Sequence, residues 1–216
     1  MKETRSSEQP TRHQVKTEAT LRGLLDAAET IFVRDGYERA QIETIAAEAG
    51  RTKGAIYAHF QSKEEIFFAL LERRITKHRE LIIPSVQEVP VQHRIEVMKE
   101  LFLSFFEDEN WHILMLEFKL FALRNKASLR RVQELYQLAY DWFTRALLPK
   151  GEGFTDAQKD RVLIALAILR GIPSGVLLEK QFNPVLNSPG AATPALEAIF
   201  DSLLNPRALK PRSKNK

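Results

Sequence analysis

The sequence of 216 residues contains no cysteine. This absence excludes disulfides, thiolate catalysis and metal sites with cysteine ligands. Long apolar runs are also absent: the longest covers residues 162–169, far short of the ~18 residues that a membrane helix needs. The N-terminus is polar and has no apolar signal core. We therefore expect a cytoplasmic protein with no membrane segment.

Catalytic constellations are missing as well. The five histidines are scattered along the chain and form no metal-binding triad. Only residues 109–112 have the Glu-x-x-His spacing of a di-iron bundle, which needs two copies. The Gly-Glu-Gly stretch at 151–153 lies between predicted helices rather than after a strand, so it is not a phosphate-binding loop. We predict a protein that is not an enzyme and has neither a metal nor a cofactor.

The positive net charge of +4 comes from the C-terminal end. Five bases and no acid follow Asn205, and removing those five from the 32 bases leaves 27 against 28 acids. The rest of the chain is nearly neutral, so its bulk charge is no argument for nucleic-acid binding. We interpret residues 206–216 as a basic, solubilising tail.

Apolar residues recur at three- and four-residue spacing, and no sustained period-two alternation appears. This pattern predicts an all-α fold of about nine helices. The predicted helices cover residues 15–34, 42–49, 53–59, 62–83, 91–107, 111–124, 128–148, 156–181 and 194–204. Capping boxes at Ser62 and Glu65, and at Thr155 and Gln158, mark two of their starts. Pro84 is expected to end the helix before it.

The two short predicted helices near residue 50 have the spacing of a helix-turn-helix, with a long helix on either side. Ala46 leaves room for the helices to cross, and Gly50 permits a left-handed turn. Ile45 and Ile56 supply the buried contacts between them. The first turn of the second short helix then presents polar groups suited to DNA, namely Thr52, Lys53, Gly54 and Tyr57.

The segment FVRDGYERAQIETIAAEAGRTKGAIYAHFQSKEEIFFALLE, within residues 31–72, closely resembles the DNA-binding domain of the TetR family of transcriptional regulators. Its most specific part, AEAGRTKGAIYAHFQSKEEIF, is similar to the family's alanine–glycine turn, recognition helix and serine–lysine start of the fourth helix. The resemblance implies a homodimer that binds a palindromic operator in double-stranded DNA. It also implies a C-terminal domain that receives an effector and dimerises through the last two long helices.

The resemblance further implies roles for individual residues. Lys53 and Gly54 match positions that approach base edges, whereas Tyr57, His59 and Lys63 match positions that hold the phosphate backbone. For His59, packing against its own domain is the alternative. The complete set of DNA-binding candidates is Gln41, Arg51, Thr52, Lys53, Gly54, Tyr57, His59 and Lys63.

Three positions depart from the family pattern. Ala40 replaces the threonine that commonly caps the second helix, Arg51 occupies a turn site usually held by a small apolar residue, and Gln61 stands where proline is frequent. We expect Arg51 to turn outward to a phosphate, because a buried and unpaired guanidinium is costly. Gln41 and Thr52 match positions next to the DNA backbone, and the operator sequence does not follow from any of these residues.

Aromatic residues are concentrated between positions 102 and 143. Most are expected to build the core, and a subset to line an effector pocket, because the family usually builds its pocket on these helices. The pocket candidates are Phe102, Phe106, Trp111, Met115, Glu117, Phe118, Tyr136, Tyr140 and Phe143. Glu117 interrupts an apolar stretch, and a buried carboxylate needs a partner. That partner is an arginine such as Arg170, a water, or a cationic or hydroxylated effector.

These observations divide the chain into an arm over 1–12, a helix-turn-helix DNA-binding domain over 13–61, an effector-binding and dimerisation domain over 62–205, and the tail. Within the second domain, the helix over 62–83 is the connector. We predict a repressor that a small apolar or amphipathic effector releases from its operator. Two alternatives stay open: an activator or global regulator without an effector, and a helical interaction or enzymatic bundle with a vestigial helix-turn-helix.

Overall fold

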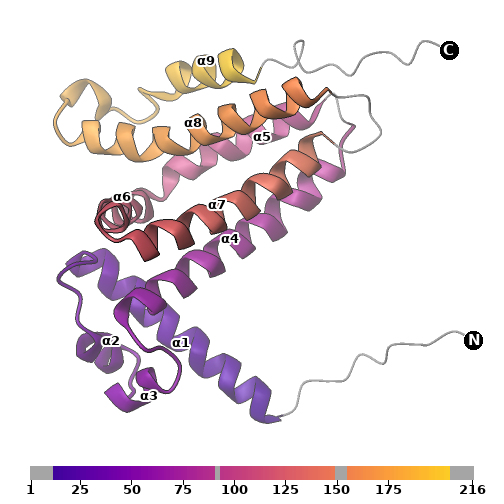
Figure 1. Cartoon of the computed structure of the whole chain (residues 1–216). Coiled ribbons are helices and arrows are strands. Elements are labelled where there is room, and N and C mark those ends of the chain that lie inside the picture. The colour runs from indigo at the N-terminus through magenta and orange to yellow at the C-terminus, as the bar shows by residue number, and fades with distance from the viewer. Residues whose placement is uncertain (1–11, 91–92, 149–154, 205–216) are drawn as a thin grey trace, which may run out of the picture. The chain divides into compact units, whose positions relative to one another are not determined.

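The computed structural model describes residues 12–90, 93–148 and 155–204 (Figure 1). These residues form nine α-helices joined by turns and short 3-10 helices, and no strand occurs among them. The predicted all-α fold is therefore confirmed. The predicted basic tail, and the predicted arm apart from Arg12, lie outside the described residues.

The chain divides into two compact units after Leu71. The division falls inside helix α4 (Lys63–Gln87), which begins in the first unit and continues into the second. The boundary that we predicted from the sequence, between residues 61 and 62, lies just before this helix.

The first unit contains α1 (Arg12–Asp35), α2 (Ile42–Glu48), α3 (Lys53–Tyr57) and the start of α4. Its core is aromatic. The rings of Phe32 and Phe67 are 5.6 Å apart, and Tyr37 contacts both at 5.7 and 5.2 Å. Each of these side chains is at most 2% exposed. This contact fastens α1 and the loop after it to the start of α4.

Helix α4 begins close to the predicted capping box but with a shifted partner. The Ser62 hydroxyl accepts a hydrogen bond from the Glu65 amide at 3.2 Å, as expected. The Glu65 carboxylate returns to the amide of Gln61 at 2.6 Å rather than to that of Ser62. Two free amides at the helix start are therefore satisfied, with the carboxylate one residue further back.

The expectation that Pro84 ends the connecting helix is wrong, because α4 runs through it to Gln87. A proline inside a helix removes one backbone hydrogen bond. Ile82 and Val86, two residues before and two residues after Pro84, are both 0% exposed. The Glu88 amide donates a hydrogen bond to the Pro84 carbonyl at 2.9 Å, so the helical pattern continues past the proline. Burial of these apolar side chains offsets the lost bond and keeps the chain helical.

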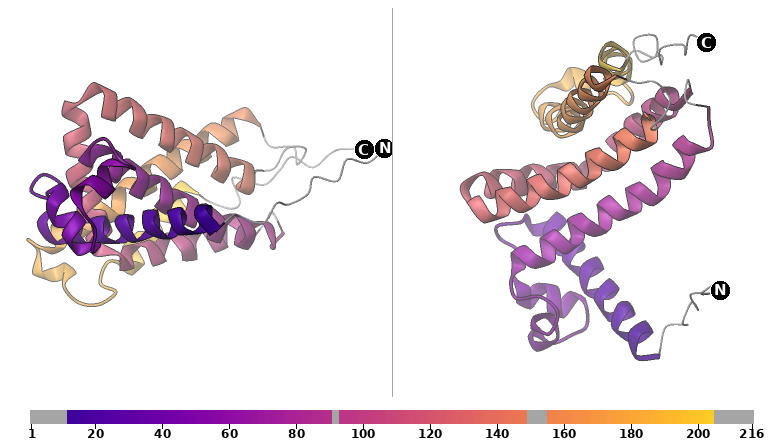
Figure 2. Two further views of the ribbon diagram at one scale, coloured as in Figure 1. Left: turned by 90° about the horizontal axis from the view of Figure 1, so that it is seen from below. Right: turned by 45° about the vertical axis from the view of Figure 1, so that its right-hand side comes forward.

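The second unit continues with five more α-helices and two 3-10 helices. They are α5 (Arg94–Ser104), which passes into the 3-10 helix η2 (Phe105–Glu107), α6 (Glu109–Arg124), α7 (Lys126–Leu147), α8 (Asp156–Lys180), the 3-10 helix η3 (Pro184–Leu186) and α9 (Thr193–Leu203). Helix α6 packs against α7 and α8, and α9 packs against α5 and α8 (Figures 1 and 2). One apolar cluster joins the end of α4 to α5, α7, α8 and α9, and it includes the rings of Phe102 and Phe200, whose centres are 5.5 Å apart.

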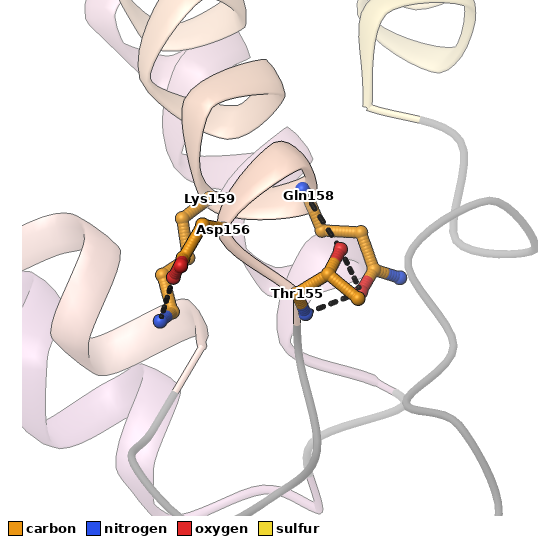
Figure 3. A network of polar contacts seen from close by, with 4 residues as sticks. All are labelled: Thr155, Asp156, Gln158 and Lys159. Carbon is orange, nitrogen blue, oxygen red and sulfur yellow. Dashed lines mark hydrogen bonds and ion pairs between the residues drawn. The ribbon is translucent and has the colours of Figure 1, made fainter.

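Side-chain caps define where these helices begin. Asp108 accepts from the Trp111 amide at 3.2 Å and starts α6. The predicted capping box at the start of α8 is confirmed: Thr155 and Gln158 exchange hydrogen bonds between side chain and backbone at 2.8 and 3.3 Å (Figure 3). Asp156 and Lys159 add an ion pair at 2.8 Å in the same turn.

Helix α8 is more apolar than its unbroken runs suggest. An 18-residue window has a mean hydropathy of 1.8, which by length and composition alone is enough to cross a membrane. The run-length criterion missed it because the run ends at Arg170. Core helices of globular proteins pass the same test, and Val162 and Leu169 are buried in the cluster described above. On its other side, Ile164 and Ile168 are 62% and 47% exposed.

Candidate nucleic-acid interface

The turn between α2 and α3 fixes the direction of the second short helix (Figure 1). Gly50 adopts the left-handed conformation with φ 61°, and the Arg51 amide returns to the Ala46 carbonyl at 2.9 Å. Thr52 then caps α3, its hydroxyl accepting from the Ala55 amide at 3.3 Å. Ile56, 1% exposed, anchors the opposite side of α3 in the core. The first turn of α3 is thereby held outward.

Seven of the eight predicted DNA-binding residues are exposed; they are Gln41, Arg51, Thr52, Lys53, Gly54, Tyr57 and His59. Lys53 and Tyr57 lie one turn apart on the same face of α3, with the ammonium 5.7 Å from the ring centre. Tyr57 is 46% exposed, which is unusual for a large aromatic side chain on a helix with a buried opposite face. His59 is also exposed rather than packed into the domain.

Gly54 has room for a side chain within its own unit. A Cβ atom built on Gly54 meets only the Thr52 hydroxyl, at the ordinary contact distance of 3.8 Å, and the residue has no left-handed backbone. The fold therefore does not require glycine here, in contrast to Gly50. What glycine provides at this exposed position is a surface on which a ligand can approach the backbone closely.

The ammonium of Lys53 is paired with the carboxylate of Glu43, across from α3 to α2. This hydrogen bond lowers the pKa of Glu43 and raises the pKa of Lys53. Both side chains are about half exposed, at 57% and 51%, so the pair is open to solvent and to competing ligands. Sequence reasoning assigned Lys53 to DNA bases but did not identify the carboxylate that holds it.

Lys63 is placed differently from the other candidates. Its ammonium donates to the carbonyl oxygens of Glu38 and Ala40 at 2.8 and 3.1 Å and lies 5.0 Å from the centre of the Tyr37 ring. Burial lowers the pKa of Lys63. Lys63 therefore stabilises the loop between α1 and α2. Its two carbonyl partners lie 25 and 23 residues earlier in the chain, so no local sequence signal indicates these hydrogen bonds.

The predicted effector residues all lie in the second unit. The apolar cluster that includes α5 and α9 contains Phe102, Phe106, Tyr140 and Phe143. Three others lie buried on α6, namely Trp111, Met115 and Phe118. Glu117 and Tyr136 are partly buried. Among the described residues, no group of three or more His, Asp or Glu side chains is arranged to hold a metal ion.

Arg170 on α8 contacts the rings of two tyrosines on α7. Its guanidinium carbon lies 3.6 Å from the centre of the Tyr136 ring and 5.8 Å from that of Tyr140. The sequence offers Arg170 as one possible partner of Glu117, and the structure places its guanidinium against the two tyrosines of α7. Arg170 and Tyr136 lie on different helices and far apart in the sequence, so no local sequence signal indicates this contact.

Comparison with known proteins agrees with the fold and with the geometry of the first unit. The model of the family described as bacterial regulatory proteins, tetR family, matches residues 24–70. The uncharacterized HTH-type transcriptional regulator YwcC of Bacillus subtilis (strain 168) is 31% identical over 108 residues, which are 46% of this chain and 48% of YwcC. The chain thus spans about half the length of this curated relative.

Two solved structures extend the likeness to nearly the whole chain. The fatty acid degradation regulator FadR from Bacillus halodurans has a TM-score of 0.67 at 16% identity, over 89% of this chain and 96% of FadR. SmeT, the repressor of the Stenotrophomonas maltophilia multidrug efflux pump SmeDEF, has a TM-score of 0.58 at 27% identity, over 91% and 93%. With the helix-turn-helix described above, the match over residues 24–70 shows that the first unit is a DNA-binding domain of the tetR family of bacterial regulatory proteins, and the two solved structures show that nearly the whole chain shares their fold.

Proposed function

We propose that this chain is a homodimeric repressor, released from a palindromic operator by a small-molecule effector. The observation that carries the proposal is the exposed face of α3, on which Lys53, Gly54 and Tyr57 lie together. A cation, an open backbone and a phenol on one face of a short helix are suited to base edges and phosphates.

The roles follow from position. The first turn of α3 enters the major groove, where Lys53 and the Gly54 backbone meet base edges. The exposed side chains around it contact the phosphates on either side; they are Gln41, Arg51, Thr52, Tyr57 and His59. In a two-fold dimer, two such helices read half-sites one helical turn apart, which is about 34 Å along the DNA.

The dimer is proposed to form through α8 and α9. Ile164 and Ile168 are one turn apart on α8 and are 62% and 47% exposed, and Ile199 on α9 is 39% exposed. A stripe of exposed isoleucines on the outer side of core helices is typical of an interface between subunits. Because operator DNA is the partner, we place the protein in the cytoplasm.

Release by an effector is a shift between two conformations. An effector that favours the conformation with lower DNA affinity must weaken operator binding by the same factor by which DNA weakens effector binding. A factor of about 5 to 150 corresponds to about 1 to 3 kcal/mol of coupling free energy. The similarity to SmeT, the repressor of an efflux pump, supports repression over the alternative of an activator without an effector.

The test is selection of genomic DNA fragments by the purified full-length protein at near-physiological salt, followed by sequencing. Enrichment of a palindrome is the expected result. Binding that is sensitive to salt but blind to sequence would contradict the proposal, because phosphate contacts alone supply non-specific affinity. The variant Lys53→Ala is expected to relax the sequence preference, whereas Arg51→Ala is expected to weaken binding to all sequences and to reduce the salt slope by about 0.9.

A further inference from the structure

Cationic and hydroxyl-bearing side chains converge where α6, α7 and α8 pack together in the second unit. Lys119 comes from α6, Tyr136 and Tyr140 from α7, and Arg170 from α8. The Lys119 ammonium lies 5.9 Å from the centre of the Tyr136 ring, and the Arg170 guanidinium lies 3.6 Å from the same centre. We call these four residues the Arg170 cluster. Two cationic side chains therefore lie near the ring of Tyr136.

The charges of the Arg170 cluster have one sign. Within residues 12–90, 93–148 and 155–204, no ion pair involves Lys119 or Arg170. Burial and the charge of Arg170 both lower the pKa of Lys119. Glu117 is two residues from Lys119 along α6, and residues at that spacing do not face each other. Two partly buried cations side by side favour the arrival of an anion.

The hydrogen-bonding capacity of the cluster is only partly used. Burial raises the pKa of Tyr136 and of Tyr140, and the charge of Arg170 and its hydrogen bonding to their hydroxyls oppose this rise. A guanidinium has five N–H donors, so those not directed at the two tyrosines stay available. Apart from Arg170, the buried hydroxyl of Tyr136 has no hydrogen-bond partner among the described residues, and the buried hydroxyl of Thr144 has none there. Buried hydroxyls nearly always have a partner, so these two indicate a place for a polar ligand.

The hydroxyls form a row. Tyr136, Tyr140 and Thr144 follow one another at four-residue spacing, which places them along one stripe of α7. At the middle of the row, Tyr140 packs against the apolar cluster that contains Leu166 and Leu169 of α8. This part of the helix packing is therefore polar and cationic at one end and apolar beside it.

We propose that the Arg170 cluster binds the carboxylate of an amphipathic organic acid, whose apolar body lies against the neighbouring apolar cluster. Arg170 supplies a paired donor edge that matches a carboxylate, Lys119 supplies a second positive charge, and the Tyr136 hydroxyl donates a hydrogen bond to a carboxylate oxygen. This inference rests on the proposed function, because it names the chemical class of the effector. It narrows the predicted small apolar or amphipathic effector to an acid, in place of the cationic or hydroxylated effector that Glu117 indicates.

The test is isothermal titration calorimetry of the full-length protein with matched pairs of probes at neutral pH. The probes are octanoate, decanoate, benzoate and salicylate, each compared with its primary amide. We expect at least one acid to bind and its amide to bind about tenfold more weakly or worse, because charged hydrogen bonds are lost. The inference is overturned if no acid binds at millimolar concentration, or if acid and amide bind equally.

Variants identify the residues responsible. Arg170→Gln is expected to lower the affinity for the acid to that for the amide. Arg161→Gln, an exposed arginine on the same helix, is the matched control and leaves both affinities unchanged. Retention of the acid preference by Arg170→Gln overturns the assignment.

Two further variants keep the test informative if Arg170→Gln does not fold. Tyr136→Phe retains the ring and removes only the hydroxyl, and Lys119→Gln removes only a charge. Each is expected to weaken binding of the acid by about tenfold and to leave the amide unaffected. Equal losses for acid and amide in both variants contradict the inference, because they indicate a change in packing rather than in recognition of the carboxylate.

The outcome is separable from that of the proposed function. Selection of a palindromic fragment together with no binding of any acid overturns this inference and leaves the DNA-binding proposal standing. Binding of an acid that depends on Arg170, together with DNA binding that is blind to sequence, supports this inference and contradicts the proposed repressor.

Discussion

Lys53 on α3 forms an ion pair with Glu43 on α2, so the cation proposed to read DNA bases already has a partner within its own domain. Exposed ion pairs contribute only about 0.2 to 1 kcal/mol, and DNA competes with Glu43 for the same ammonium. The pair therefore lowers the affinity for any DNA that does not offer Lys53 a better partner. A correct base edge does so, and an incorrect one does not.

Replacement of Glu43 by glutamine is predicted to raise the affinity for non-specific DNA about two- to fivefold. The ratio of operator affinity to non-specific affinity should therefore decrease. Fluorescence anisotropy with both kinds of duplex measures this. Glu48→Gln removes an equal charge from an exposed position on the same helix and is the control. Equal effects of the two substitutions would show that only net charge matters and that the ion pair has no special role.

Gly54→Ala is predicted to separate stability from DNA binding. Alanine fits at this position and favours the helix, so the free energy of unfolding should rise by about 0.5 kcal/mol. The added methyl group stands on the surface that approaches the bases, so operator affinity should fall by about tenfold or more. Gly23→Ala on α1, where a Cβ atom also meets nothing, is the control for helix stabilisation alone. If Gly54→Ala binds the operator as tightly as the unaltered protein does, the DNA bases do not approach the backbone at Gly54.

Lys63→Met is predicted to destabilise the first unit. The substitution leaves the carbonyl oxygens of Glu38 and Ala40 without their donor, at a cost of about 1 to 3 kcal/mol. Urea unfolding measures this loss, and Lys77→Met, an exposed lysine further along α4, is the control. If Lys63→Met unfolds like the unaltered protein but binds DNA more weakly, the phosphate role expected from the sequence is the better description.

Local signals account for what could be predicted from the sequence. The left-handed glycine at Gly50 and the cap at Thr52 are decided by interactions within four residues, and both are found as expected. Small and apolar residues at the crossing, such as Ala46 and Ile56, are buried for the same reason. Interactions over such short separations are encoded by residue type and spacing alone.

Contacts between distant segments could not be predicted in this way. Pro84 breaks isolated helices, but the burial of Ile82 and Val86 in the second unit overrides that tendency. Arg170 reaches Tyr136 only because α7 and α8 pack together. A cation and a ring on different helices acquire a common role through tertiary packing, and neither residue shows it alone.

The proposed dimer predicts that charge on the outer side of α8 prevents association. The double variant Ile164→Glu with Ile168→Glu should be monomeric in analytical ultracentrifugation at concentrations where the unaltered protein is dimeric, since burying two unpaired carboxylates costs several kcal/mol. Leu120→Glu with Leu123→Glu places the same charges on α6, at leucines that are 50% and 67% exposed. Dissociation by the α6 variant alone would move the interface to that helix.

His78 is predicted to make stability depend on pH. Burial first, and then the charges of Arg74, Arg170 and Lys77, lower the pKa of His78 to about 4, while Asp108 opposes them. Below the ordinary histidine pKa of 6.5 the unfolded chain takes up a proton that the folded chain does not. The free energy of unfolding should therefore decrease as the pH falls from about 6.5, by about 1 kcal/mol by pH 5.5.

His78→Phe removes this titration and keeps a ring against Phe105, whose centre lies 4.9 Å from that of His78. The variant should consequently lose less stability than the unaltered protein between pH 7 and pH 5.5, by about the same 1 kcal/mol. His93→Gln, at an exposed histidine, is the control and should retain the original dependence. Urea unfolding at a series of pH values measures all three proteins. Parallel curves for His78→Phe and the unaltered protein would mean that His78 takes up its proton equally in the folded and unfolded chains, because only a difference in proton uptake makes stability depend on pH.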